Sequence, residues 1–385
     1  MSKLDELIKK YCPDGVEYKK LGDIATISRG GNFQKKDYVS TGVPCIHYGQ
    51  LYVHYNLFTD NVITYIHKDK AVKQKFAEPN DIIMAVTSEN IEDVCKSIAW
   101  LGEKKVAVSG HSAIIHHSMN PKYLAYYLNS LHFYKQKVKL AHGTKVIEVT
   151  PSALNEVSLP VPPLPVQEEI VRILDSFTSL TAELQAELQA RKKQYEYYRN
   201  ILYTKHDYCP KKKLIDISDI SRGIRVVKKN LIDDGKFPVY QNSLTPMGYY
   251  NKSNVTENTT YVISAGAAGE IGFCNTNFWA ADDCLVFSNL KEIRNKYIYY
   301  FLLTKQDFIR SNVRKASVPR LSRTVIENLQ IPIISLEEQD KILSLLDRFD
   351  TICNDITTGI PAEIAARQKQ YEYYRDKLLT FKELS

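Results

Sequence analysis

The sequence predicts an α+β protein in which two α/β-type bodies are separated by two long antiparallel coiled-coil helical spacers, in a pseudo-twofold circular arrangement. Three observations support this fold class. The heptapeptide KQYEYYR occurs at 193–199 and again, unchanged, at 369–375. Each copy ends a longer stretch whose apolar residues have helical spacing. The two bodies share short motifs, such as ISRG at 27–30 and 220–223, among patterns of short strands, turns and helices.

Length and composition agree with two domains and connecting helices. The chain has 385 residues, of which 44% are hydrophobic and 11% aromatic, enough for two cores. No apolar run approaches the roughly 18 residues of a membrane span, and the start, MSKLDELIKK, has no apolar stretch of a signal peptide. The seven cysteines are scattered and form no C-x-x-C pair. We therefore expect a cytoplasmic protein without membrane contact.

The first element, residues 1–16, is predicted to be an amphipathic helix that docks on the C-terminal helix. Its motif YCP at 11–13 returns at 208–210, directly after the central helix. The N-terminus therefore resembles the tail of a helical spacer that begins at the other end of the chain. Docking of these two ends would close the ring of bodies and spacers.

The two bodies are predicted at 17–160 and 208–332. The motif VPCIHYGQ at 43–50 resembles FPVYQNS at 237–243. The net charge of the chain is +7, and Lys and Arg outnumber Asp and Glu within the bodies but not within the helical segments. A polyanion would therefore meet the bodies, although a basic surface without a partner is the alternative explanation.

The central helical spacer is predicted at 161–207. Its seam residues alternate in steps of four and three: Ile170, Leu174, Phe177, Thr181, Leu184, Leu188, Arg191, Tyr195, Tyr198 and Leu202. This spacing is typical of a coiled coil. At ~1.5 Å per residue, about 40 helical residues extend over roughly 60 Å.

The second helical spacer is predicted at 333–385 and begins like the first. The sequence TTGIPAE then interrupts it, where Gly359 can end one helix and Pro361 can begin the next. The pattern resumes and ends, as before, in KQYEYYR.

Together these features resemble the DNA-specificity subunit of type I restriction–modification systems. The most specific motifs are Q-x-x-I-x-x-x-L-D-x-F and R-x-K-Q-Y-E-Y-Y-R in both spacers, with P-x-x-x before the first of these motifs in the first spacer, and G-I-P-A-E-I in the second spacer. The tandem tetrapeptides of TAELQAEL at 181–188 look like the type IC subgroup. In the second body, KFPVYQNS, FWAADDC and ASVPRLSR also fit the family's recognition domains, whereas the first body fits less closely.

The resemblance implies a non-catalytic subunit that works on DNA in a bacterial or archaeal cytoplasm, as part of phage defence. The two bodies would be target recognition domains, each reading one half of a bipartite, asymmetric site in double-stranded DNA. Two methyltransferase subunits would bind the chain, and restriction subunits would join through them. We expect no cofactor in this chain. The methyltransferase would use S-adenosylmethionine, and the restriction subunit ATP and magnesium.

The residues themselves leave two alternatives open. Asp81, Glu103 and Lys105 approximate the spacing of metal-dependent nucleases, in which two carboxylates bind magnesium and a lysine lies near the attacking water. A coiled-coil interaction protein without sequence-specific DNA binding is the second alternative. The chain has no methyltransferase, P-loop or zinc motif, and we expect no catalytic or metal-binding residues.

Candidate DNA contacts lie in polar turns of the bodies. Lys and Arg would bind phosphates, and Asn, Gln and Arg can pair with base edges. In the first body the candidates are Arg29, Asn32, Gln34, Lys35, Lys36, Tyr48, Gln50, Tyr52, Ser88, Asn90, Thr144 and Lys145. In the second body they are Arg222, Arg225, Lys228, Lys229, Tyr240, Gln241, Asn242, Arg314, Lys315, Ser317, Arg320 and Arg323.

Candidate partner contacts lie in the repeated heptapeptide. Its seam tyrosines can be explained by packing between helices. Six residues off the seam are identical in both copies, more than packing requires, and these are predicted to bind two copies of one partner: Glu196, Tyr197, Arg199, Glu372, Tyr373 and Arg375.

Overall fold

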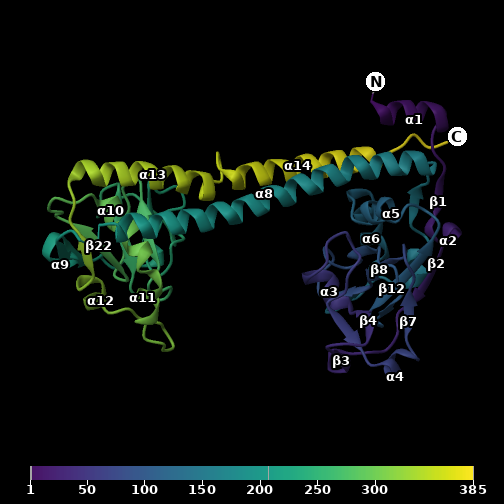
Figure 1. Ribbon diagram of the computed structural model, residues 1–385, viewed down its shortest axis with the longest axis horizontal. Coiled ribbons are helices and arrows are strands. Elements are labelled where there is room, and N and C mark those ends of the chain that lie inside the picture. Colours follow the sequence, from purple (N-terminus) through teal and green to yellow (C-terminus); the bar gives the residue numbers. More distant parts are fainter. Residues whose placement is uncertain (1, 207, 385) are drawn as a thin grey trace. The chain divides into compact units, whose positions relative to one another are not determined.

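A computed structural model describes residues 2–206 and 208–384 (Figure 1). The chain forms two compact units, Met1–Glu183 with Ile364–Ser385 and Leu184–Glu363. Each unit joins one mixed α/β body to helical segments from two distant parts of the chain. The division into five segments, with borders after 16, 160, 207 and 332, stays a prediction, because the compact units share the long helices between them.

The body of the first unit contains two five-stranded sheets. The first has the order β2 (Ala25–Arg29), β12 (Ser112–His117), β8 (Ile82–Ala85), β10 (Ser97–Trp100) and β5 (Phe58–Thr59). The second has the order β3 (Tyr38–Val39), β6 (Thr64–Ile66), β4 (Val43–Ile46), β11 (Val106–Val108) and β7 (Lys75–Ala77). Two short pairs complete it, β1 (Tyr18–Lys20) with β14 (Ser158–Pro160) and β9 (Thr87–Ser88) with β13 (Ile147–Glu148). Its helices are α2 (Leu21–Ile24), α3 (Tyr48–Val53), α4 (Lys68–Ala71), α5 (Pro121–Leu128), α6 (Leu131–Leu140) and α7 (Pro151–Leu154).

The body of the second unit repeats this plan with shorter sheets. Four strands form the order β16 (Asp219–Arg222), β22 (Cys284–Ser288), β19 (Thr259–Ile263) and β20 (Ile271–Cys274). Three form the order β18 (Gly248–Tyr250), β17 (Phe237–Tyr240) and β21 (Trp279–Ala280). The pair β15 (Lys211–Lys213) with β23 (Gln330–Pro332) matches β1 with β14. Its helices are α9 (Leu214–Ile217), α10 (Asn295–Thr304), α11 (Gln306–Ser311) and α12 (Arg323–Glu327).

The long helices follow the predicted pattern. Helix α8 runs without a break over 41 residues, Leu164–Thr204. Its seam residues Thr181, Leu184 and Leu188 are half-buried, whereas their neighbours along the helix are mostly exposed. Helix α13 (Leu336–Asn354) ends before TTGIPAE, and α14 (Ile360–Leu378) begins after Gly359. The predicted interruption of the second spacer is therefore confirmed.

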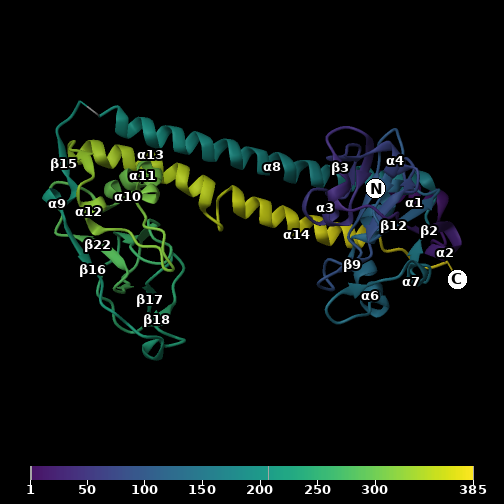
Figure 2. The ribbon, with the colours of Figure 1, turned by 90° about the horizontal axis from the view of Figure 1, so that it is seen from below.

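Within the second unit, α8 and α13 lie side by side and run antiparallel (Figure 2). The rings of Tyr195 and Tyr198 stack on Phe349, at centroid distances of 6.3 and 5.5 Å. Lys192, which precedes Tyr195 on α8, lies close enough for its charge to act on the thiol of Cys353, which follows Phe349 on α13. Residue numbers therefore rise along one helix as they fall along the other.

The two copies of KQYEYYR pack in matching surroundings. Tyr195 is 6% exposed and meets Tyr300 of α10 edge to face at 6.5 Å. Tyr371 is 8% exposed and meets Tyr126 of α5 at 6.4 Å. Each heptapeptide therefore packs on the tyrosine-rich helix of one body, which accounts for its seam tyrosines by packing alone.

A buried glutamine joins each body to a long helix. The side-chain oxygen of Gln167 accepts a hydrogen bond from the backbone of Asn120, at the start of α5, over 2.9 Å. The side-chain oxygen of Gln339 accepts one from the backbone of Arg294, at the start of α10, over 2.8 Å. Each amide also donates to a carbonyl just before its own position. The glutamine of the repeated Q-x-x-I-x-x-x-L-D-x-F motif therefore holds each body in a fixed position on its helix.

The chain ends meet within the first unit. Helix α1 (Lys3–Tyr11) is held to α8 by an ion pair of 2.8 Å between Lys3 and Glu169, whose side chain is buried. Val16 forms a parallel bridge with Glu383 beyond α14. Leu4 of α1 also shares a hydrophobic cluster with residues of α14. The N-terminal segment therefore meets the C-terminal segment within this unit, whereas docking of the N-terminal helix on the C-terminal helix stays a prediction.

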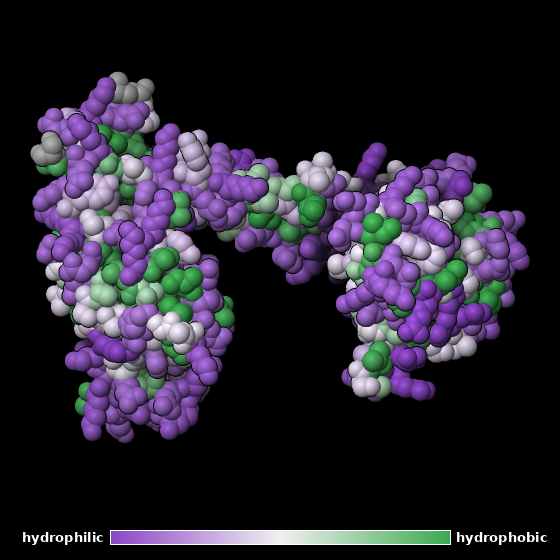
Figure 3. All heavy atoms as spheres, turned by 180° about the vertical axis from the view of Figure 1, so that it is seen from behind, coloured by the Kyte–Doolittle hydropathy of each residue, from purple (hydrophilic) through white to green (hydrophobic). Residues whose placement is uncertain are grey.

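The visible face of each unit is mostly hydrophilic (Figure 3). In residues 2–206 and 208–384, no helix is both long and apolar enough to cross a membrane.

Candidate nucleic-acid interface

In the first body, the predicted DNA-contacting segments come together although they are far apart in the sequence. The hydroxyl of Tyr52 donates to the carbonyl of Thr87 over 2.7 Å. Arg29 donates a hydrogen bond to the carboxylate of Glu148 over 2.9 Å. Glu148 lies in β13, which follows the segment His142–Lys145 and pairs with the strand that contains Ser88. Backbone and side-chain contacts thus gather these turns into one surface, which we call the first reading face.

The predicted residues of this face differ in their exposure. Asn32, Gln34, Lys35, Lys36, Asn90, Thr144 and Lys145 are exposed, and Tyr48 and Ser88 are half-buried. Lys35 and Lys36 begin a 3₁₀ turn, Lys35–Asp37, and their ammonium groups are available to an anion. Exposure and residue type therefore suit six of these candidates to DNA contact, whereas both polar atoms of the Asn90 side chain are bonded to Asp93.

Three further candidates have internal roles that correct the sequence-based expectation. Gln50 is only 7% exposed, and its amide bonds to the backbone of His47 and the hydroxyl of Thr64. The hydroxyl of Tyr52 already donates within the body. Arg29 is exposed, but its guanidinium is shared between Glu148 and the carbonyl of Gly110. These residues shape the first reading face, because burial or local bonding leaves them little freedom to reach a base.

An aromatic stack on the first reading face was not predicted from the sequence. The rings of His47 and Tyr48 lie 4.5 Å apart, and those of Tyr48 and His111 lie 4.9 Å apart. The hydroxyl of Thr87 lies 3.1 Å from a ring nitrogen of His111. Burial, with the charge of Lys35, lowers the pKa of His47, so its ring is neutral at pH 7. Nothing in the sequence around His111 connects it with the other two rings.

The predicted segments of the second body also converge. The amide of Gly223 donates to the carbonyl of Cys284, and that of Ala267 to the carbonyl of Asn242. Gly266 donates to Pro319 within the loop from Arg314 to Arg323. These turns form a second reading face at the equivalent end of the sheets.

The second reading face is rich in cations that the protein does not neutralise. Arg222, Arg225, Lys228, Lys229, Asn242, Arg314, Lys315, Ser317, Arg320 and Arg323 are exposed. Within the described chain, only Arg323 of these cations forms an ion pair, with Glu327 at 2.6 Å. Gln241 and Tyr240 are half-buried. The ring of Tyr240 packs on that of Tyr261, and burial raises the pKa of Tyr240 to about 12. Tyr240 therefore supports the face, and the free cations are suited to phosphates.

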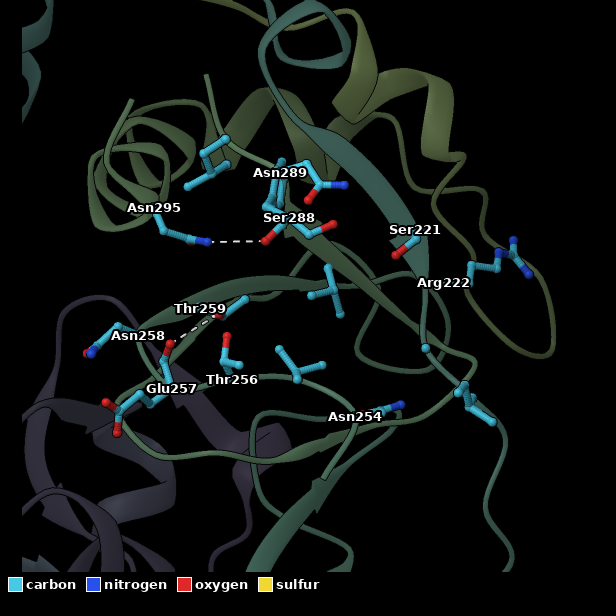
Figure 4. Close-up of a pocket in the computed structure, with 16 residues that line it drawn as sticks. Ser221, Arg222, Asn254, Thr256, Glu257, Asn258, Thr259, Ser288, Asn289 and Asn295 are labelled. Atoms are coloured by element: carbon cyan, nitrogen blue, oxygen red, sulfur yellow. Dashed lines mark hydrogen bonds between the residues drawn. The ribbon is translucent and has the colours of Figure 1, made fainter. Parts of the chain in front are cut away.

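A groove of about 620 Å³ continues this face along the sheet. Ser221 of β16 and Ser288 of β22 line one side of it, and Thr256 and Glu257 of the loop before β19 line the other (Figure 4). Because Arg222 also lines the groove, a ligand on the second reading face could extend into it. Hydroxyl and amide groups of this kind can bond a sugar–phosphate backbone.

The off-seam residues of KQYEYYR divide into two groups. Tyr197 and Tyr373 are 60% and 61% exposed, and Glu196 and Glu372 beside them are also exposed. We call these two matching surfaces the tyrosine patches. Each patch presents the same residues to solvent on a long helix.

The two arginines of the heptapeptide turn inward, which corrects their assignment as exposed partner contacts. The guanidinium of Arg199 lies over the ring of Tyr195 at 5.3 Å, and that of Arg375 lies over Tyr371 at 5.6 Å. Arg375 also pairs with Asp376 at 3.0 Å. Packing on these rings explains why both arginines are identical in the two copies.

The chain matches the family model described as "Type I restriction modification DNA specificity domain" twice, at residues 13–191 and 209–366. The chain belongs to this family.

A putative type I restriction enzyme specificity subunit of Haemophilus influenzae is 30% identical to this specificity protein over 95% of the chain and 96% of its own length. The EcoR124I/EcoR124II specificity subunit of Escherichia coli is 32% identical over 68% of the chain and 70% of its own length. The S subunit of M. genitalium has a similar fold, with a TM-score of 0.58 at 17% identity, covering 95% of this chain and 96% of its own. The HsdS subunit of Thermoanaerobacter tengcongensis gives a TM-score of 0.51 at 14% identity, covering 96% and 97%.

The fold class predicted for this specificity protein is thereby confirmed, whereas the type IC-like assignment stays a prediction. The nuclease alternative gains no support from its residues. One carboxylate oxygen of Asp81 lies 2.6 Å from a ring nitrogen of His116, and the other accepts from the backbone of Glu78. Glu103 is exposed, and Lys105 lies over the ring of Phe76. Asp81 is therefore committed to the structure of its loop.

Proposed function

We propose that this chain is the DNA-binding specificity subunit of a type I restriction–modification complex, and that each body reads one half of a bipartite, asymmetric target. The observation that carries this proposal is a duplicated unit with unlike reading faces and like helices. Unlike faces suit unlike half-sites, and like helices suit two copies of one partner.

The electrostatics of the reading faces support the choice of DNA. Lys35 and Lys36 on the first face and Arg225, Lys228 and Lys229 on the second are exposed. Cations of this kind bind phosphates and release counterions, which gives affinity without sequence preference. Asparagine, glutamine and arginine side chains among them supply the hydrogen bonds that distinguish base pairs.

The tyrosine patches are the proposed docking sites for two methyltransferase subunits. An exposed tyrosine with a neighbouring carboxylate offers apolar area and polar bonds together, as is common at the centre of protein interfaces. Restriction subunits would join through the methyltransferases. In this arrangement the chain itself is not an enzyme. S-adenosylmethionine, ATP and magnesium would belong to its partners, and the assembly would act on DNA in the cytoplasm.

Methylome sequencing of cells that carry this chain with its methyltransferase tests the proposal. We expect a methylated motif of two short parts separated by unread bases. When residues 208–332 are replaced by the corresponding body of another specificity subunit, one part should change and the other should remain. A single uninterrupted motif, or a change in both parts, would contradict the assignment of one half-site to each body.

A further inference from the structure

One tight turn occupies the same position on both reading faces. In the first body, the amide of Ser112 donates to the carbonyl of Ser109 over 3.0 Å. In the second, the amide of Cys284 donates to the carbonyl of Ala281 over 2.9 Å. We call these the platform turns, residues 109–112 and 281–284.

The backbone around the platform turns matches bond for bond. A carbonyl of each turn accepts a hydrogen bond from the amide of the glycine that ends the ISRG motif. An amide of each turn donates a hydrogen bond to the last carbonyl of β4 in the first body or of β17 in the second. The matching pairs are Gly30 to Ser112 and Gly223 to Cys284, Gly31 to Val108 and Ile224 to Ala280, and Ser109 to Ile46 and Ala281 to Tyr240, all between 2.7 and 3.1 Å. Gly110 and Asp282 therefore occupy equivalent positions, and so do His111 and Asp283.

The platform turns thus hold different side chains on the same backbone. The first body has Gly110 and His111, and the second has Asp282 and Asp283. Each turn lies beside the predicted contact segments of its own face, because the bonds above connect it to ISRG and to the segment ending in Ile46 or Tyr240. A change of side chain here changes the chemistry of a reading face without changing its shape.

Asp282 carries an unused acceptor. The residue is half-buried: its Oδ1 is enclosed and has no hydrogen-bond partner within residues 2–206 and 208–384, while part of the residue remains exposed. Because no ion pair occupies the carboxylate in the described chain, its exposed part can accept a hydrogen bond from a ligand. Here it lies on a face whose exposed cations would otherwise favour any anion, where a carboxylate opposes non-specific binding to phosphates.

We propose that Asp282 is a specificity-determining residue that accepts a hydrogen bond from the N4 amino group of a cytosine in the second half-site. This inference rests on the proposed function. In the major groove, guanine presents two acceptors and thymine an acceptor beside its methyl group, and a carboxylate repels both. Adenine presents an amino group next to the N7 acceptor, so one of its two groups opposes Asp282. Cytosine alone offers the donor without a neighbouring acceptor.

The first body cannot make this contact from the equivalent position, because Gly110 has no side chain. Its carbonyl is also used by Arg29. The two platform turns therefore contribute to the difference between the half-sites.

Two substitutions at Asp282 test the inference in the intact complex with its methyltransferase. Asp282→Ala should remove the preference for cytosine at one position of the second half-motif and weaken binding to the natural site by about 10- to 100-fold, the usual effect of one wrong base pair. Asp282→Asn should shift that position towards adenine, because an amide can donate to N7 and accept from N6. Asp216→Asn, which removes a charge from an exposed residue of α9 in the same body, outside the second reading face and its groove, is the matched control and should leave the motif unchanged.

Non-specific binding gives a second readout that a structural role would not produce. Both Asp282 variants lose a negative charge from a basic face, so their affinity for unrelated DNA should equal or exceed that of the wild type. Their melting temperatures should not fall, since the lost oxygen had no partner. Specific affinity therefore falls while non-specific affinity does not.

Each outcome decides between the inference and the function on which it rests. A bipartite motif whose second half contains no C·G pair, or that stays unchanged in Asp282→Ala, overturns the role of Asp282 and leaves the proposed function intact. A uniform loss of affinity for all DNA with a lowered melting temperature assigns Asp282 a structural role instead. Absence of any bipartite motif in the wild type contradicts the proposed function itself.

Discussion

The hydroxyl of Tyr300 donates a hydrogen bond to the carboxylate of Asp347 over 2.6 Å. Lys296 pairs with the same carboxylate at 2.8 Å, so one acid of α13 receives two donors from α10. The first unit repeats this arrangement between α5 and α8 with Tyr126, Lys122 and Asp175. The aspartate of the repeated L-D-x-F motif therefore fastens each body to its helix.

Tyr300→Phe should destabilise the second unit by about 1–3 kcal/mol, because a hydrogen bond to a charged acceptor is lost at a buried side chain. Urea unfolding of the purified chain measures this change. Tyr208→Phe makes the same chemical change at a residue that is 81% exposed and should have no measurable effect. Equal effects of both substitutions would mean that the contact between Tyr300 and Asp347 contributes no stability.

The tyrosine patches predict a stoichiometry. Tyr197→Ala should leave a chain that binds one methyltransferase subunit, and Tyr197→Ala with Tyr373→Ala should bind none, because an exposed aromatic residue at an interface contributes about 2 kcal/mol or more. Native mass spectrometry counts the bound subunits. Arg199→Ala is the control: its guanidinium packs on Tyr195, so it should lower stability and leave two subunits bound. If the double variant still binds two methyltransferase subunits, the tyrosine patches are not part of the interface.

The exposed lysines of the second reading face predict a salt effect without a sequence effect. Lys228→Ala and Lys229→Ala should each weaken binding to all DNA sequences and reduce the slope of log affinity against log salt by about 1. Fluorescence anisotropy across a salt series measures the slope. Lys341→Ala removes the same charge from α13, away from the face, and should leave the slope unchanged. A changed methylated motif in the Lys228 variant would instead indicate base contact.

The unbroken α8 predicts the effect of lengthening its tandem tetrapeptide at 181–188. One further T-A-E-L lengthens a helix by roughly 6 Å and rotates the residues beyond the insertion by about 40°. One base pair of DNA turns through roughly 34–36°. Both half-sites should therefore remain, and the unread gap should widen by about one or two base pairs, which methylated-motif sequencing would reveal.

A two-residue insertion at the same place is the matched control for this insertion. It turns the residues beyond it by about 200°, which directs a reading face away from its groove, so specific binding should disappear. An unchanged gap after the tetrapeptide insertion would mean that α8 does not set the spacing of the half-sites.

The ion pairs of Glu169 predict a pH dependence. Hydrogen bonds from Arg172, and then from Lys3, lower the pKa of Glu169 to about 2 against the opposite effect of burial. A lowered folded-state pKa stabilises the fold above the unfolded-state value of about 4.3, and this stability is lost as the pH falls from there to about 2. Glu169→Gln should therefore destabilise the chain by about 1–3 kcal/mol at pH 7 and by about half as much at pH 3, where the folded carboxyl is still mostly ionised, as followed by thermal unfolding. A difference that is constant with pH would exclude a role for the carboxylate charge.

The helices could be predicted from the sequence because their information is local. The spacing from Ile170 to Leu202 and the Gly and Pro of TTGIPAE determine where the helices run and break, with no help from distant residues. The body strands are only two to six residues long and pair across large sequence separations. Their order is therefore decided by tertiary packing, which periodicity cannot reveal.

The candidate site was predicted in part for the same reason. Exposed polar turns such as Lys35–Lys36 are recognisable by composition. The inward turn of Arg199, the burial of Gln50 and the contact between Tyr48 and His111 depend on neighbours that lie elsewhere in the chain. The equivalence of Gly110 and Asp282 became visible only from matching backbone bonds, because the two turns share no residue type at those positions.

The glutamine seats at Gln167 and Gln339 have an evolutionary consequence. Both bind backbone amides of the body, Asn120 in one case and Arg294 in the other, so the joint does not depend on which side chain the body presents there. Genetic recombination that exchanges one body for another at these joints would leave the seat unchanged. A lineage could therefore acquire a new DNA target in a single crossover while the rest of its defence enzyme stays as it was.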